Sequence, residues 1–236
     1  MPVDELLYFL FEKESNPLQQ PVADWLASSR RFSAFVLAHQ TKIRKKIRST
    51  RDPETLRDLQ LELETAWLLL RERSLDLAYE PVHPHEGRSP DFAVSFTTSL
   101  TFMLEVTRLR LGAQAFDPST GDRFTDVLCG KLRQLLSHTG NVLLVGVEGA
   151  PPAGGQLHAS MLRIQQRAER SDPSVVERQG FRGPPDFFRH YRRLSAVLVR
   201  GIPNEAGQPP LLWDNPQTAH PLPPRVRLAL SRALSV

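Results

Sequence analysis

Two neighbouring segments in which apolar residues recur at every second position constrain this chain more than any other feature. Residues 91–97 read Asp-Phe-Ala-Val-Ser-Phe-Thr, and residues 100–107 read Leu-Thr-Phe-Met-Leu-Glu-Val-Thr. A period of two is typical of a half-buried β-strand. The short connection around Thr98 and Ser99 therefore predicts that the two strands form an antiparallel hairpin.

The two faces of this hairpin differ in polarity. One face carries Phe92, Val94, Phe96, Phe102, Leu104 and Val106, and the other carries Asp91, Ala93, Ser95, Met103, Glu105 and Thr107. A hairpin centred near residue 98 or 99 sets Asp91 roughly opposite Glu105 or Val106. We therefore expect two carboxylates close together on one face.

The segments around the hairpin alternate between helical and strand periodicity. Apolar residues spaced three and four apart predict helices over residues 21–32 and 35–48. A third helix is expected from Pro53 to Leu70, after the capping candidates Ser49, Thr50, Arg51 and Asp52. The remaining expected elements are a strand over 75–79, a helix over 123–138, a buried strand over 141–147, a helix over 156–169, a strand over 194–202, an extended segment over 211–216 and a helix over 225–234. We predict an α/β domain over residues 49–236 with a mixed central sheet flanked by helices, and an N-terminal helical segment over residues 1–48 packed on it.

Several classes of protein are disfavoured by composition. No apolar run approaches the roughly 20 residues that span a bilayer, and Asp4 and Glu5 stand where a signal peptide carries positive charge. The single cysteine, Cys129, excludes an internal disulfide and a cysteine-based zinc site. We therefore predict a cytoplasmic protein without a membrane segment.

The charge balance favours an acidic partner. The formal net charge is +4 and the pI is about 9.6, and nucleic acid is the commonest partner of basic proteins. Five basic residues gather at the end of one predicted helix, and they are candidates for nucleic-acid binding: Lys42, Arg44, Lys45, Lys46 and Arg48. The alternative is a solvated helix terminus whose charges suit the helix dipole.

The order helix, strand, hairpin, helix, strand (αβββαβ) accompanies a short acidic motif. Pro90-Asp91 is followed, after 13 residues, by Glu105-Val106-Thr107. Over about residues 50–148 the chain thereby resembles the PD-(D/E)XK nuclease superfamily, which has the restriction-endonuclease-like fold. The resemblance implies divalent-metal-dependent hydrolysis of phosphodiester bonds in nucleic acid, with DNA as the expected substrate. It also leaves a homodimer open, because many nucleases of this fold act as dimers to cut both strands.

The resemblance assigns oxygen ligands for Mg²⁺ or Mn²⁺. Asp91 and Glu105 would bind the ion, with the Val106 carbonyl as a third protein oxygen. Such hard cations keep several waters and need only one or two carboxylates. An acid on the preceding helix often completes the site, and here Glu62 and Glu64 compete. We favour Glu62, which lies nearer the buried stripe of its helix.

The departure from the family pattern is Thr107, which stands where the family usually has lysine. Threonine supplies no positive charge and is a poor general base. Lys131 on the following helix is placed to compensate, with Gln134 three residues further on. If neither compensates, the alternative is a catalytically inactive protein that binds nucleic acid or acts as a scaffold. A third alternative is an enzyme that acts on a small molecule.

Other interpretations remain for single residues. Asp91 could cap its strand, Glu105 could pair with Arg108 or Arg110, and Thr107 could be structural. The spacing of His83 and His85 resembles a metal pair, but they stand in a proline-rich loop without nearby cysteines. The sequence contains neither a P-loop ending in Gly-Lys-Ser/Thr nor a Gly-x-Ser-x-Gly elbow.

Overall fold

A six-stranded mixed sheet organises the computed structural model, with its strands in the order β1-β2-β3-β4-β5-β6. The structure describes residues 2–12, 16–50, 52–81, 89–110, 112–117, 123–149, 151–203 and 208–235. Strands β3, β4 and β5 run parallel, and the other neighbouring pairs are antiparallel. The strands are β1 (Leu75–Tyr79), β2 (Phe92–Phe96), β3 (Leu100–Leu109), β4 (Asn141–Glu148), β5 (Leu194–Ile202) and β6 (Leu211–Asp214).

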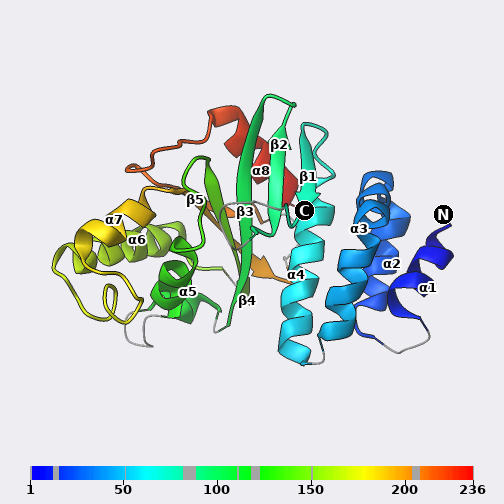
Figure 1. Ribbon diagram of the computed structural model, residues 1–236, viewed down its shortest axis with the longest axis horizontal. Helices are drawn as coiled ribbons and strands as arrows, with labels where there is room; N and C mark the ends of the chain where they lie inside the picture. The colour runs from blue at the N-terminus through cyan, green and yellow to red at the C-terminus, as the bar shows by residue number, and fades with distance from the viewer. Residues whose placement is uncertain are drawn as a thin grey trace.

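Helices cover both faces of this sheet, which confirms the predicted α/β class (Figure 1). They are α1 (Val3–Phe11), α2 (Gln19–Ser28), α3 (Arg30–Ser49), α4 (Pro53–Leu69), the 3₁₀ helix η1 (Gly112–Phe116), α5 (Arg123–Leu132), α6 (Gly154–Glu169), α7 (Pro184–Tyr191) and α8 (Pro224–Leu234). Among the described residues, none of these helices combines the length and the apolar character needed to cross a bilayer.

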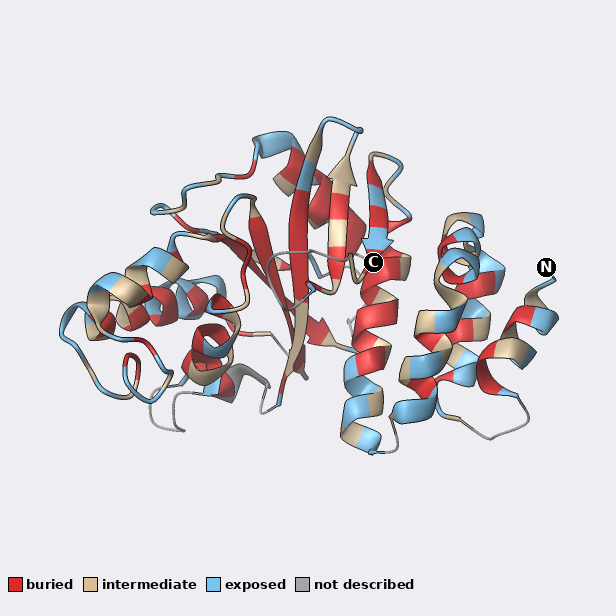
Figure 2. Ribbon diagram, viewed as in Figure 1, coloured by how far each residue is buried: buried red, intermediate tan, exposed pale blue. Residues whose placement is uncertain are grey.

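Two apolar clusters lie on opposite faces of the sheet. One joins side chains of α1 to α4 and α8 to residues such as Phe92, Leu104 and Leu144. The other joins η1, α5, α6 and α7 to residues such as Leu143 and Val145. Figure 2 shows the buried residues concentrated on the sheet and on the inner sides of the helices. Successive residues of one strand therefore contact different clusters, as the strand period requires.

The predicted hairpin is confirmed, together with its register. Phe96 faces Leu100 and Phe92 faces Leu104 across β2 and β3. The connecting turn holds Thr97 and Thr98 at positive φ. One further step along this register sets Asp91 opposite Glu105.

The ends of the helices follow local hydrogen bonding. At the start of α4, Asp52 Oδ2 accepts a hydrogen bond from the Thr55 N–H at 3.0 Å, and Pro53 occupies the first turn, as predicted. The predicted helix over 21–32 is wrong at its end: Ser29 Oγ accepts a hydrogen bond from the Phe32 N–H at 3.2 Å. Ser29 therefore caps α3, and Phe32 belongs to that helix.

Two further helices, α5 and α7, differ from the predictions. Helix α5 ends at Leu132 and does not reach residue 138. The Asn141 side chain accepts a hydrogen bond from the Leu136 N–H and donates one to the Leu136 carbonyl. These hydrogen bonds hold the backbone at Leu136 in a turn, so the helix does not continue. Helix α7 was not among the predicted elements.

Candidate functional site

Asp91 lies directly before β2 and reaches across to β3. Its Oδ2 accepts a hydrogen bond from the Val106 N–H at 2.8 Å. Since β2 begins at Phe92, the Val106 N–H has no ladder partner from β2, and the Asp91 carboxylate satisfies it. Burial raises the pKa of Asp91, although this hydrogen bond and the charges of Lys131 and Lys46 oppose the rise.

Glu105 projects from β3 on the face that α5 covers. The residue is only 5% exposed, and its Oε2 accepts a hydrogen bond from Lys131 Nζ at 2.9 Å. Burial and the charge of Asp91 raise its pKa. The alternative partners named from the sequence are engaged elsewhere: Arg108 pairs with Glu54, Asp58 and Glu148, and Arg110 pairs with Glu54.

Glu62 approaches the same place from α4. Lys46 Nζ lies 2.8 Å from its Oε1 and 3.1 Å from its Oε2. Burial and the charge of Asp91 raise the pKa of Glu62 to about 7, although Lys46 opposes the rise. Glu64 instead points to Arg200, with 2.6 Å between Oε2 and Nη2. Of the two competing glutamates, Glu62 is therefore the neighbour of Asp91.

Tyr79 and Glu80 lie beside these acids, and neither was predicted as a site residue. The Tyr79 hydroxyl is buried and has no hydrogen bond of good geometry among the described residues. Burial and the nearby charges of Glu62, Glu80 and Asp91 raise its pKa. Glu80 Oε1 lies 2.8 Å from Lys46 Nζ. We call the six residues Lys46, Glu62, Glu80, Asp91, Glu105 and Lys131 the acid–lysine cluster.

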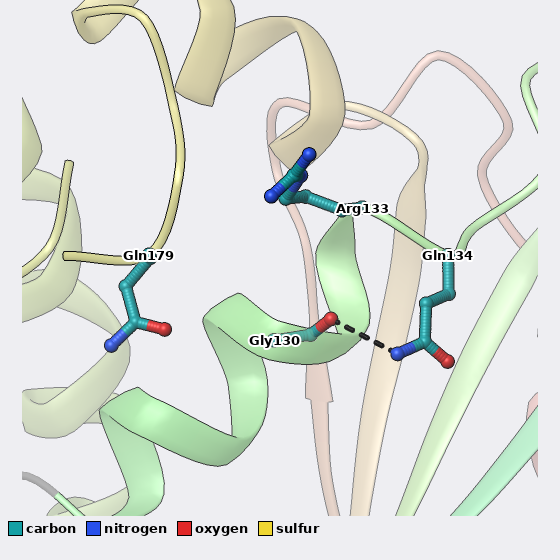
Figure 3. Close-up of a pocket in the computed structure, with 4 residues that line it drawn as sticks. All are labelled: Gly130, Arg133, Gln134 and Gln179. Atoms are coloured by element: carbon teal, nitrogen blue, oxygen red, sulfur yellow. Dashed lines mark hydrogen bonds between the residues drawn. The ribbon is translucent and has the colours of Figure 1, made fainter. Parts of the chain in front are cut away.

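The other predicted catalytic residues lie around this cluster. Thr107 is half-buried and shares the sheet face of Glu105 by strand alternation. Gln134 lies beyond the end of α5 and donates a hydrogen bond to the Gly130 carbonyl at 3.3 Å. Together with Arg133 and Gln179 it lines a cavity of about 390 Å³ beside α5 (Figure 3). Lys131 thus contacts Glu105, whereas Gln134 faces this cavity.

The predicted nucleic-acid-binding residues do not form one open basic patch. Lys42 donates to the carbonyls of Tyr79 and Glu80, and Arg44 and Arg48 both pair with Glu12. Lys46 turns toward Glu62, and Lys45 is exposed. A sequence signal for this arrangement existed: Lys42 and Lys46 stand one turn apart beside the buried stripe of Ile43 and Ile47.

The acid–lysine cluster has the donor chemistry of a hard cation site. Its four carboxylates and two ammonium groups give a charge of −2 when all are ionised, which one divalent cation would balance. Among the described residues, no three Asp, Glu, His or Cys side chains are already spaced to hold one ion. Two carboxylates with waters suffice for Mg²⁺, so Asp91 and Glu105 fit such an ion. His83 and His85 lie outside the described residues.

Comparison of the chain with protein-family models, with curated proteins and with solved structures finds no match. The residues of the acid–lysine cluster are therefore the evidence that points to a function.

Proposed function

We propose that this chain is a nuclease-like protein of the PD-(D/E)XK type that hydrolyses phosphodiester bonds in nucleic acid, with DNA as the expected substrate. The observation that carries the proposal is the convergence of buried Glu62 and Glu105 with half-buried Asp91, each with a raised pKa. Buried acids in such numbers are costly for a fold and gather at functional sites. The element order α4-β1-β2-β3-α5-β4, with β3 parallel to β4, supports the same type.

Each residue has a distinct proposed role. Asp91 and Glu105 would hold Mg²⁺ or Mn²⁺, with the Val106 carbonyl as a further oxygen ligand, and Glu62 would assist through a water. When bound, such an ion lowers the pKa of a water and offsets charge that develops on the phosphoryl oxygens. Lys131 supplies the positive charge that Thr107 lacks and would contact the scissile phosphate. Its bond to Glu105 holds its ammonium beside the acids.

The test is metal-dependent cleavage by purified protein. Single-stranded, duplex and branched DNA are incubated with Mg²⁺ or Mn²⁺, and the products are separated on denaturing gels. Asp91→Asn and Glu105→Gln should each abolish cleavage while circular dichroism shows an unchanged fold. Asp76→Asn is the matched control, because the Asp76 side chain on β1 is 80% exposed. Undiminished cleavage by Asp91→Asn would exclude the assignment.

A second candidate is a catalytically inactive protein that binds nucleic acid or acts as a scaffold. The observation in its favour is the absence of a lysine at position 107, combined with the pairing of Lys46 and Lys131 to carboxylates. It predicts binding that weakens steeply as salt rises, without cleavage under any metal condition. Electrophoretic mobility shifts on the same DNA set distinguish the two candidates.

A further inference from the structure

One lysine of the N-terminal helices reaches into the acid–lysine cluster from outside the nuclease-like part of the chain. Lys46 Nζ, on α3, lies 2.8 Å from Oε1 and 3.1 Å from Oε2 of Glu62, and 2.8 Å from Oε1 of Glu80. It also lies 5.0 Å from the centroid of the Tyr79 ring. An ammonium has three N–H donors, and three carboxylate oxygens surround this one.

We propose that Lys46 is an internal counter-ion of the acid–lysine cluster. A divalent cation must displace the Lys46 ammonium before it can bind at Asp91 and Glu105. The N-terminal helical segment would thereby set the affinity of the site for metal. This inference rests on the proposed metal site, and it assigns to Lys46 a positioning role rather than contact with nucleic acid.

The reach of this charge supports the proposal. The positive charge of Lys46 acts on Asp91 and Glu105 as well as on its direct partners Glu62 and Glu80. A cation that arrives at Asp91 and Glu105 would therefore meet the repulsion of Lys46 in a partly buried, weakly screened environment. The Lys46 ammonium already offsets part of the negative charge of these carboxylates, which the metal ion would otherwise offset. The ammonium and the metal ion therefore compete for the same acids.

Helix α3 has other anchors, so removal of the Lys46 ammonium does not release it. Lys42 donates to two backbone carbonyls at 3.1 and 2.9 Å, and these bonds do not depend on the acids. Ile43 and Ile47 are buried in the apolar cluster of α4. Lys46→Met removes the charge and keeps an apolar stem beside Tyr79.

The direct test is the affinity for Mn²⁺, measured by electron paramagnetic resonance of free Mn²⁺. The measurement is repeated at rising pH up to about 8.5. Loss of Lys46 raises the pKa of Glu62 above its value of about 7, and at lower pH a proton would replace the lost ammonium. Lys46→Met should bind Mn²⁺ about tenfold more tightly than the wild type. Lys45→Met, which removes the same charge at an exposed neighbour, should stay within about twofold.

The outcomes separate this inference from the proposed function. If Asp91→Asn abolishes Mn²⁺ binding but Lys46→Met leaves the affinity unchanged or weaker, the metal site stands and the role of Lys46 is overturned. If neither the wild type nor Lys46→Met binds Mn²⁺, both proposals fail.

A second measurement uses the wild type and does not depend on the folding of a variant. The sequence has five lysines, Lys13, Lys42, Lys45, Lys46 and Lys131, so acylation can be followed residue by residue with mass spectrometry. Displacement of Lys46 by Mn²⁺ should raise its acylation rate several-fold and leave the rate of Lys45 unchanged. An unchanged Lys46 rate at saturating Mn²⁺ would overturn the inference.

Discussion

Asp91 Oδ2 accepts a hydrogen bond from the Val106 N–H at 2.8 Å. This hydrogen bond joins the residue before β2 to the part of β3 that carries Glu105. The same carboxylate therefore has a structural and a proposed functional role. Its raised pKa means that its negative charge costs stability, whereas its acceptor oxygen contributes stability.

These two contributions can be separated by substitution. Asp91→Asn removes the charge and keeps an acceptor for Val106, whereas Asp91→Ala leaves the Val106 N–H without its partner. We expect Asp91→Ala to be less stable than Asp91→Asn by about 1–3 kcal/mol in urea denaturation at neutral pH. Equal stability of the two variants would show that the hydrogen bond contributes little.

Two glycines provide a matched pair for testing the packing. A Cβ at Gly201 on β5 would lie 2.9 Å from the Gly149 carbonyl oxygen, whereas a Cβ at Gly130 on α5 would meet nothing within 4 Å. Gly201→Ala should lower the free energy of unfolding by about 1–3 kcal/mol. Gly130→Ala should leave it unchanged or raise it by up to about 1 kcal/mol, because alanine favours the helix. Thermal denaturation measures both, and a harmless Gly201→Ala would contradict this account.

Buried Arg200 pairs with half-buried Glu64 on the α4 face of the sheet. Arg200 is only 2% exposed, and its Nε and Nη1 have no hydrogen-bond partner in the described part of the chain. Glu64→Gln leaves this charge without its carboxylate and should destabilise the protein by about 3 kcal/mol. The double variant Glu64→Gln/Arg200→Met should recover much of the lost unfolding free energy. Urea denaturation measures the stability of both variants. A neutral Glu64→Gln would mean that another group compensates Arg200.

The sequence predicted features that depend on local pattern. Strand alternation and a short turn were enough to set Asp91 roughly opposite Glu105 or Val106. Pro53, after the capping candidates at residues 49–52, marked the start of α4. The order of helices and strands predicted the mixed sheet. Local pattern did not reveal the capping role of Ser29 within a continuous run of helix formers.

Features that depend on tertiary packing were not predicted. The periodicity of α3 identifies its buried stripe but does not identify which helix or strand covers it, so Lys46 was interpreted as a residue for phosphate. The pairing of β1 with β2 brings Glu80 into the cluster and Tyr79 beside it, and the sequence did not predict this. The pairing of Glu64 with Arg200 was not predicted, because the sequence of β5 does not indicate that Arg200 is a buried charge.

The pKa of Glu62 gives a prediction for stability as a function of pH. The pKa is about 7 in the folded protein, against an ordinary value of 4.5, so the folded state holds this proton more tightly. Ionisation of Glu62 therefore has no effect below the ordinary value, and it costs progressively more stability as the pH rises from 4.5 to about 7. Relative to Glu62→Gln, the wild type should lose about 1–3 kcal/mol of unfolding free energy across this window. Urea titrations of both proteins at several pH values measure the difference, and parallel stability curves would show that Glu62 titrates normally.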